Sequence, residues 1–159
     1  MSIKVLFLSR CNAARSQIAE YLLNQMGRGM FEASSAGSTP GPINPLAIRA
    51  LEEVGINAGN AFSKPLEVFS DASFDYVINI CEVSTASCDG CRPDCPALPH
   101  ITSSGCWGFG SPPSGEDEAA KMAYLRKVRE QLTNRLRIWM PVVDRPHRES
   151  RDEGKAIPA

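Results

Sequence analysis

Residues 3–16 read IKVLFLSRCNAARS, and this stretch decides the fold class. The near-continuous apolar run Ile3–Leu8 is typical of a strand buried on both faces, as in a parallel sheet. Residues 9–16 form a polar turn. From about Arg15 to Met26, apolar side chains recur at spacings of three and four, which predicts a helix that ends at the glycines after it. A buried strand therefore leads through a short polar turn into a helix.

The rest of the chain continues to alternate between strand and helix patterns. Further strands are predicted at Phe31–Ser35, at Asp75–Ile80 and, in short form, near His100–Ser103, and helices at Leu46–Val54, from Ser63 to Phe69 and over Glu116–Met140. Asn44 is the expected cap of the second helix, with Pro45 at its first position, and Pro141 is expected to end the last one. This alternation predicts a three-layer α/β sandwich with a four-stranded parallel sheet. We expect one domain over residues 1–140 and a polar tail over 141–159 without fixed structure.

Length and charge exclude several classes of protein. With 159 residues the chain suits a single domain, and its net charge of −1 argues against broad nucleic-acid binding, which normally needs a basic excess. No apolar run approaches the ~20 residues of a membrane span, and the N-terminus MSIKVLFL lacks the pattern of a signal peptide. We therefore expect a cytoplasmic protein with neither a nucleic-acid nor a membrane partner.

The polar turn has the features of an oxyanion-binding loop. It lies at the carboxyl end of a strand and at the N-terminus of a helix, where free backbone N–H groups and the helix dipole favour anions. Arg15 can present a planar fork to a tetrahedral oxyanion, Asn12 tolerates the left-handed conformation of a tight cradle, and Ser16 can donate a hydrogen bond. The predicted oxyanion site comprises Ser9, Arg10, Cys11, Asn12, Ala13, Ala14, Arg15 and Ser16.

These residues resemble the phosphate loop of the low-molecular-weight protein tyrosine phosphatases and, most closely, that of the thioredoxin-coupled arsenate reductases. The pattern of that family is Cys-x5-Arg-Ser after an apolar strand, with Gln-x-Ala-Glu next, and residues 15–20 read RSQIAE. Further matches in the same order are Ser35-Ala36-Gly37, Asn44-Pro45, Ser63-Lys64 and Trp107-Gly108-Phe109. The resemblance covers about residues 3–140, and it implies the α/β fold of these phosphatases and a reaction on a phosphate or arsenate oxyanion.

The nucleophile position departs from the family pattern. Six residues before Arg15 the family has its nucleophilic cysteine, and this chain has Ser9. A serine hydroxyl does not reach the anionic state that such a loop stabilises in a thiol, and no histidine is near in sequence to act as its base. Two explanations stay open: an engineered Cys→Ser substitution, or a natural variant with altered or lost chemistry. Cys11 is a poor substitute because it lies two residues further along the loop.

Six cysteines in a chain expected to be cytoplasmic need a role other than structural disulfides. They are Cys11, Cys81, Cys88, Cys91, Cys95 and Cys106. The resemblance to the arsenate reductases implies a relay, in which Cys81 attacks the first adduct and an outer cysteine then moves the disulfide outward to a thioredoxin-like reductant. Cys95 is the first choice for the outer thiol because of its Cys-Pro context. Cys88 is the second, because it follows Cys81 by seven residues.

The same cluster has a second interpretation. Cys88, Cys91 and Cys95 could bind zinc or trivalent arsenic through three thiolates, but one CxxC without a paired second one is weak support. We therefore predict no metal and no cofactor, with the electrons coming from a thiol donor. Cys106 is expected to be a packing residue.

The position of the general acid also departs from the phosphatase pattern. Where the phosphatases have an Asp before Pro, this chain has Ser111, and a serine is no general acid at neutral pH. Glu116 and Asp117 follow closely, but they are expected to cap and start the last helix. This departure weakens the tyrosine phosphatase interpretation in particular.

Four residues are expected to support the loop from behind. Asn12, Glu20 and Ser35 match positions that hold a potassium ion in some family members, and Lys64 stands where those members have an Asp. An ammonium group at this position would replace the charge of the cation and support Asn12. The resemblance therefore implies loop support without a potassium requirement.

The favoured function is arsenate reduction through a cysteine relay, in a form that Ser9 leaves inactive or impaired. A low-molecular-weight protein tyrosine phosphatase is the alternative with the same fold. A non-catalytic oxyanion- or metal-binding protein is the alternative from another class. Arsenate or phosphate and a thioredoxin-like reductant are the expected partners.

Overall fold

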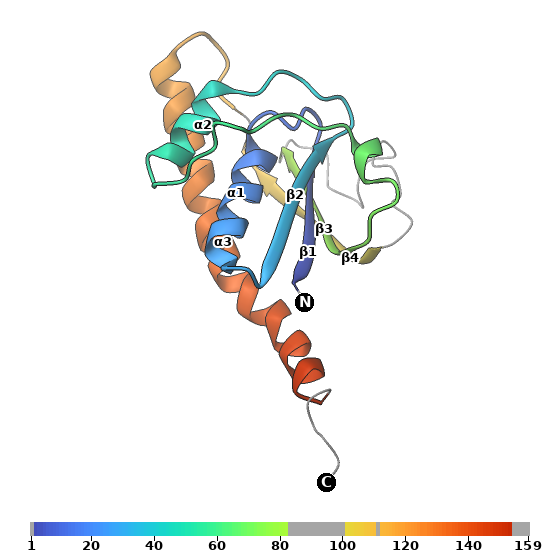
Figure 1. Ribbon diagram of the computed structural model, residues 1–159. Helices are drawn as coiled ribbons and strands as arrows, with labels where there is room; N and C mark the ends of the chain where they lie inside the picture. Colours follow the sequence, from blue (N-terminus) through green and yellow to red (C-terminus); the bar gives the residue numbers. More distant parts are fainter. Residues whose placement is uncertain (1, 83–100, 111, 154–159) are drawn as a thin grey trace.

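The computed structural model describes residues 2–82, 101–110 and 112–153. Four strands and four helical segments make up this part of the chain (Figure 1). The strands are β1 (Ile3–Ser9), β2 (Phe31–Gly37), β3 (Phe74–Glu82) and β4 (Ile101–Phe109). The helical segments are α1 (Arg15–Gly27), α2 (Pro45–Glu52), the 3₁₀ helix η1 (Leu66–Phe69) and α3 (Glu118–Glu153).

The four strands form one parallel sheet in the order β2-β1-β3-β4, which confirms the predicted fold class. Phe7 of β1 pairs with Ser35 of β2, and Leu8 pairs with Asn79 of β3. The chain thus runs outward from β1 to one side through β2 and to the other through β3 and β4. At such a switch point the connections leave in opposite directions, and a crevice forms at the carboxyl ends of the strands.

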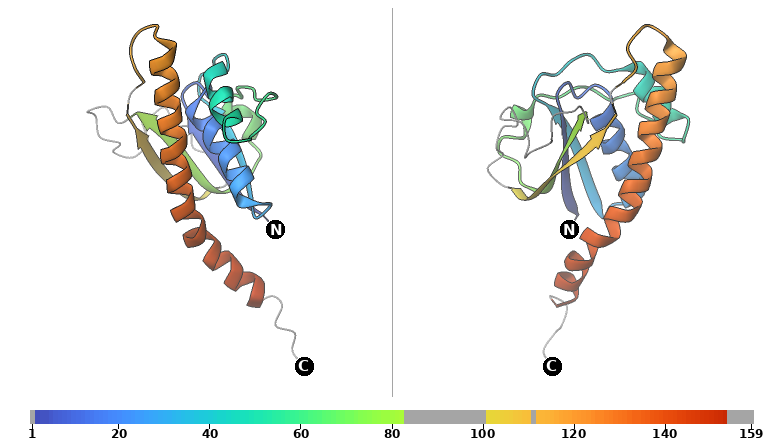
Figure 2. Two further views of the ribbon diagram at one scale, coloured as in Figure 1. Left: turned by 90° about the vertical axis from the view of Figure 1, so that its left-hand side faces the viewer. Right: turned by 180° about the vertical axis from the view of Figure 1, so that it is seen from behind.

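The two faces of the sheet are covered by different elements. Side chains of α1, α2 and α3 pack with Val5 and Phe7 on one face, where Figure 2 shows α1 and α3 side by side. The other face carries Leu6 and Leu8, and Leu66 of η1 packs against them. The helices on the first face fix α1, so the turn between β1 and α1 is held at the carboxyl edge of the sheet.

The local signals for α2 act as the sequence predicts. The Asn44 side chain accepts a hydrogen bond from the Leu46 amide at 3.0 Å, and Pro45 takes the first helical position. The helix ends at Glu52, two residues before the predicted Val54.

The prediction for the last helix is wrong at its C-terminal end. α3 does not stop at Pro141 but continues through Pro146 to Glu153, so residues 141–153 are helical and not an unstructured tail. A proline inside a helix costs about 3 kcal/mol. Beyond Pro141, however, Val143 is only 7% exposed and Asp144 only 3%, so this segment still packs against the domain, and burying a valine stabilises by about 1.5–3 kcal/mol.

The fourth strand is longer than predicted. It runs over Ile101–Phe109, whereas the sequence favoured only a short strand near residues 100–103. Its glycines and serines give a weak strand pattern, but Trp107 and Phe109 alternate into the core and are almost fully buried. Long-range packing therefore defines a strand that local propensity does not.

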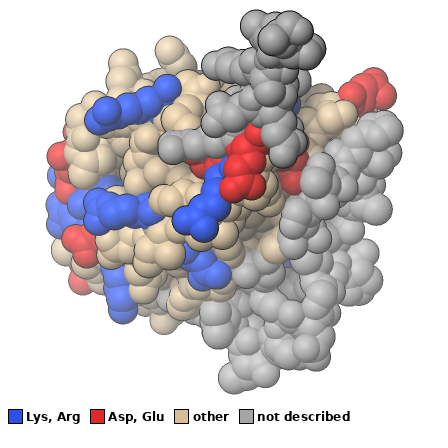
Figure 3. Space-filling view, turned by 90° about the horizontal axis from the view of Figure 1, so that it is seen from below, with Lys and Arg blue, Asp and Glu red and all other residues tan. Residues whose placement is uncertain are grey.

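Charged residues of the two signs are nearly balanced, with 17 Lys and Arg residues against 18 Asp and Glu residues. Figure 3 shows the molecule from below, and there Lys and Arg side chains lie scattered over the described surface with Asp and Glu side chains among them. Within the described residues, no helix combines the length and the apolar composition that crossing a membrane requires.

Candidate oxyanion-binding site

The backbone of the turn between β1 and α1 is held from outside. Three of its carbonyl oxygens accept hydrogen bonds from the neighbouring segment 39–44. The pairs are Thr39 N with Arg10 O at 2.8 Å, Gly41 N with Cys11 O at 3.0 Å and Asn44 N with Ala13 O at 2.9 Å. These three hydrogen bonds tie the outer side of the loop to segment 39–44.

Several backbone N–H groups of the loop are available to a ligand. Within the described residues, the amides of Cys11, Ala13 and Ala14 have no hydrogen-bond acceptor. Ala14 stands at the N-cap of α1 and provides no side-chain cap, so the first amides of the helix also face the loop. The positive end of the helix dipole adds to them. Arg15 is the first residue of α1 and its side chain is half-buried.

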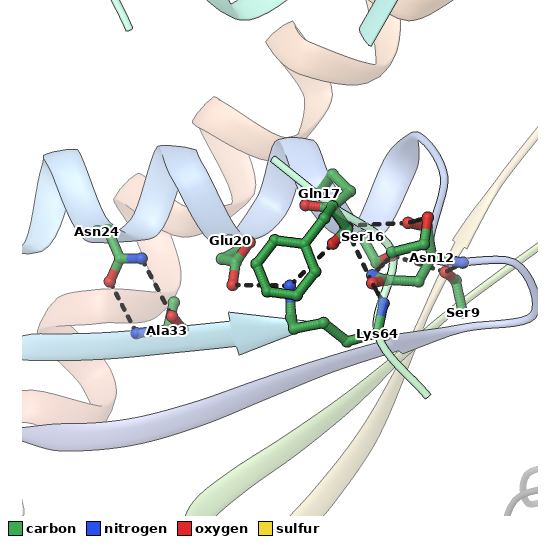
Figure 4. A network of polar contacts seen from close by, with 10 residues as sticks. Ser9, Asn12, Ser16, Gln17, Glu20, Asn24, Ala33 and Lys64 are labelled. Atoms are coloured by element: carbon green, nitrogen blue, oxygen red, sulfur yellow. Dashed lines mark hydrogen bonds and ion pairs between the residues drawn. The ribbon is translucent and has the colours of Figure 1, made fainter. Parts of the chain in front are cut away.

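Asn12 fixes the shape of the loop, as Figure 4 shows. The residue is fully buried and adopts a left-handed backbone with φ of 50°. All its polar groups have partners. As donors, its N–H binds Ser9 Oγ (3.1 Å) and its Nδ2 binds Ser16 Oγ (2.8 Å). As acceptors, its main-chain oxygen binds Gln17 Nε2 (3.0 Å) and Ser63 Oγ (2.9 Å), and its Oδ1 binds Gln17 Nε2 (3.0 Å) and the Lys64 amide (2.9 Å). The strained conformation is thus held by bonds from three separate segments.

The end of β2 passes close behind the loop. A Cβ atom on Gly37 would lie 2.8 Å from the Arg10 carbonyl oxygen and 2.9 Å from the Asn12 nitrogen, so only glycine fits here. The Gly37 amide donates to the Lys64 carbonyl at 2.9 Å.

Gly37 and Gln17 contact the loop, and the sequence reasoning did not assign either of them to the site. Both lie within motifs noted in the sequence, Ser35-Ala36-Gly37 and RSQIAE. Their roles come from contacts with distant segments, since Gln17 also donates to the Phe62 carbonyl at 2.9 Å.

The nucleophile position lies at the start of the loop. Ser9 ends β1, and its hydroxyl is 2.6 Å from the hydroxyl of Ser16. The Asn12 amide donates to the same oxygen. An anionic atom in the place of Ser9 Oγ would therefore receive hydrogen bonds from both groups and the field of the α1 dipole.

The residues predicted to support the loop lie close to one another beside Asn12. Lys64 Nζ lies 3.7 Å from Glu20 Oε1, and the same ammonium donates to the Phe62 carbonyl at 3.2 Å. Burial raises the pKa of Glu20 above its usual range, while the charge of Lys64 and the polar groups of Ser35 lower it. The structure thus brings Glu20, Ser35 and Lys64 together beside Asn12, and their role in supporting the loop stays a prediction.

The other predicted site residues are described only in part. Cys81 lies on β3 two residues beyond Asn79, the partner of Leu8, so its backbone reaches the same carboxyl edge of the sheet as Ser9. Cys11 is exposed and is a free thiol. Cys88, Cys91, Cys95 and Ser111 lie outside the described residues, and so does the outer half of the predicted relay.

Two further predictions from the sequence concern the cap of α3 and a possible metal site. Asp117 Oδ1 accepts a hydrogen bond from the Ala119 amide at 3.0 Å, the expected capping role. Among the described residues no three His, Cys, Asp or Glu side chains gather as a metal site. The cluster of Cys88, Cys91 and Cys95 is not covered by that statement.

A parallel α/β sheet with an amide-lined loop at its switch point is an arrangement that favours the binding of phosphate and similar anions. Residues 4–149 match the family model described as "Low molecular weight phosphotyrosine protein phosphatase", and the chain therefore belongs to this family. The family resemblance drawn from the sequence is confirmed.

Arsenate reductases are prominent among the similar proteins. An arsenate reductase of Bacillus subtilis is 31% identical over 134 residues, which are 84% of this chain and 91% of that protein. The structure of a thioredoxin-dependent arsenate reductase of Corynebacterium glutamicum has a TM-score of 0.66 and 32% identity, and the match covers 90% of this chain and 62% of that one. An arsenate reductase in the phosphate binding state has a TM-score of 0.64 at 28% identity, covering 85% of this chain and 94% of that chain.

Proposed function

We propose that this chain is the Ser9 form of an arsenate reductase of the low-molecular-weight phosphatase family, with the loop 9–16 as its oxyanion site and with Ser9 in the place of the nucleophile. The observation that carries the proposal is the arrangement of that loop, with carbonyls tied outward to segment 39–44 and free amides inside. Such a cradle at a helix N-terminus suits a tetrahedral anion with several acceptor oxygens. The arsenate reductases among its relatives support arsenate as that anion.

The proposed reaction needs a thiolate at position 9. The thiolate attacks the arsenic of arsenate, an As–S bond forms, and an oxygen leaves as water after protonation. Cys81 then attacks the sulfur of this adduct. An S–S bond forms, the As–S electron pair passes to arsenic, and arsenite leaves with arsenic reduced from the +5 to the +3 state. Cys95, or Cys88 in its place, attacks the disulfide in turn and carries it outward.

Ser9 interrupts this sequence at its first step in the present chain. Its hydroxyl occupies the place of the thiol and keeps the contacts to Ser16 and the Asn12 amide. The anion cradle itself does not depend on the sulfur. We therefore propose that this form binds the oxyanion and does not reduce it.

The electron donor is proposed to be a small dithiol protein. One relative is named glutaredoxin arsenate reductase, and one similar structure is described as thioredoxin-dependent. Such donors work in the reducing cytoplasm, where we place the activity. The proposal includes no resident metal or cofactor and no potassium requirement, because Lys64 supplies a positive charge beside Asn12.

Titration of the unmodified chain tests the oxyanion site. We expect phosphate and arsenate to bind with similar affinity, because the loop offers the same amides and Arg15 to both tetrahedral anions. Isothermal titration calorimetry measures the binding, and nitrate, which is planar and carries one charge, serves as the control anion. Absence of binding by both phosphate and arsenate would refute the proposed site. In the Ser9→Cys variant, turnover of an aryl phosphate without reduction of arsenate would favour the phosphatase alternative instead.

Oxidation mapping tests the relay. After mild oxidation we expect a disulfide between Cys81 and Cys95, with Cys88 as the second candidate. Cys81 stands at the fixed end of β3, and a disulfide needs Cα atoms within about 7 Å. Mass spectrometry of the non-reduced peptides identifies the pair, with Cys81→Ser as the matched control. Stoichiometric zinc, or a map in which Cys81 never appears, would end the relay model.

A further inference from the structure

The ion pair between Lys64 and Glu20 is unusually enclosed for this protein. The two side chains are only 11% and 14% exposed, whereas those of the ion pair Arg49–Glu118 are 60% and 70% exposed. Exposed pairs contribute little to stability, and enclosed pairs lose much of their attraction to desolvation. Stability alone therefore does not explain why two charges are enclosed here.

Phe62 contacts Lys64, whose ion pair with Glu20 Figure 4 shows. Its ring centroid lies 4.6 Å from Lys64 Nζ, and its carbonyl oxygen accepts from the same ammonium at 3.2 Å. Phe62 itself is 62% exposed, and its aromatic face attracts the ammonium. Because the side chains of Lys64 and Glu20 are largely buried, salt screens their charges less than it screens surface charges.

Both charges are attached to the segments that hold the oxyanion loop. The Lys64 amide donates to Asn12 Oδ1, and its carbonyl accepts from Gly37. Glu20 lies one helical turn after Ser16 on α1. The pair is therefore connected to the oxyanion loop through Asn12, Gly37 and α1.

We propose that the Lys64–Glu20 pair sets the charge behind the oxyanion loop, and that the affinity for the oxyanion depends on the balance between the two side chains. This inference rests on the proposed oxyanion binding. With both residues present their charges cancel. A carboxylate left alone would repel an anion in the loop, and an ammonium left alone would attract it.

Three variants test the charge balance through phosphate calorimetry. We expect Lys64→Met to bind phosphate roughly tenfold more weakly near neutral pH, and Glu20→Gln to bind it as well as or better than the unmodified chain. The double variant should return to the unmodified affinity. A purely structural role predicts weaker binding in all three, and that result would overturn the proposal. Arg49→Met, which removes an exposed pair, is the matched control.

A second measurement remains informative if the unmodified chain binds no phosphate, the result that would refute the proposed function. Amide chemical shifts of residues 9–16 are recorded without ligand. Shifts that move in Lys64→Met and return in the double variant support the charge balance. Shifts that stay unchanged in Lys64→Met, or that fail to return in the double variant, overturn it.

Discussion

Ser9→Cys is expected to give the chain an arsenate reductase activity that the serine form lacks. The new thiol would lie at the N-terminus of α1, near the Ser16 hydroxyl and the Asn12 amide that contact Ser9 Oγ. These groups stabilise a thiolate, so its pKa should fall well below the free value of ~8.5. Arsenite release with a thioredoxin-like donor measures the activity, and the rate of alkylation against pH reports the pKa.

Two control variants separate position 9 from other thiols. Ser9→Ala should stay inactive, because it supplies no nucleophile. The combination of Ser9→Cys with Cys11→Ser should keep the activity, since Cys11 is exposed and lies two residues along the loop. If the Ser9→Cys protein reduced no arsenate with any thiol donor, the reductase function would have to be abandoned.

Arg15→Ala is expected to abolish measurable phosphate binding. Arg15 opens α1 beside the free amides of the loop, and a guanidinium can donate two charge-assisted hydrogen bonds to one oxyanion. At about 1.5–3 kcal/mol each, their loss weakens binding more than a hundredfold. Calorimetry with phosphate measures the effect.

The matched substitutions for this experiment separate charge from geometry. Arg15→Lys keeps the charge without the planar fork and should bind with intermediate affinity. Arg49→Ala removes an exposed arginine on α2 and should bind normally. Unchanged phosphate affinity in Arg15→Ala would contradict the assignment of this loop as the site.

The sequence predicted those parts of the fold that local patterns define. The apolar run of β1, the helical spacing of α1 and the cap at Asn44 all depend on residues close in sequence, and the structure has them as expected. The end of α3 and the length of β4 depend on burial of Val143 and Trp107 against distant elements. Patterns within a few residues cannot report such contacts.

In the candidate site, too, some features follow from neighbouring residues and others from distant contacts. A loop between an apolar strand and a helix, with Asn and Arg at fixed spacing, could be recognised from adjacent residues. The contribution of Gln17 depends on its bonds to Asn12 and Phe62, and that of Gly37 on the approach of the Arg10 carbonyl. These partners come together only through the topology of the sheet.

The rigid hold on Asn12 has a consequence for selectivity. Because the loop has its final shape before an anion arrives, binding involves little rearrangement, and the cradle has no means to separate two ions of equal charge and nearly equal size. The occupancy of the loop would then depend on the concentrations of the two anions. In a cell rich in phosphate, phosphate would occupy the site most of the time. Discrimination has to come after binding, because a thiol can reduce arsenic(V) but not phosphorus(V). Competing phosphate would slow such an enzyme without ever being consumed by it.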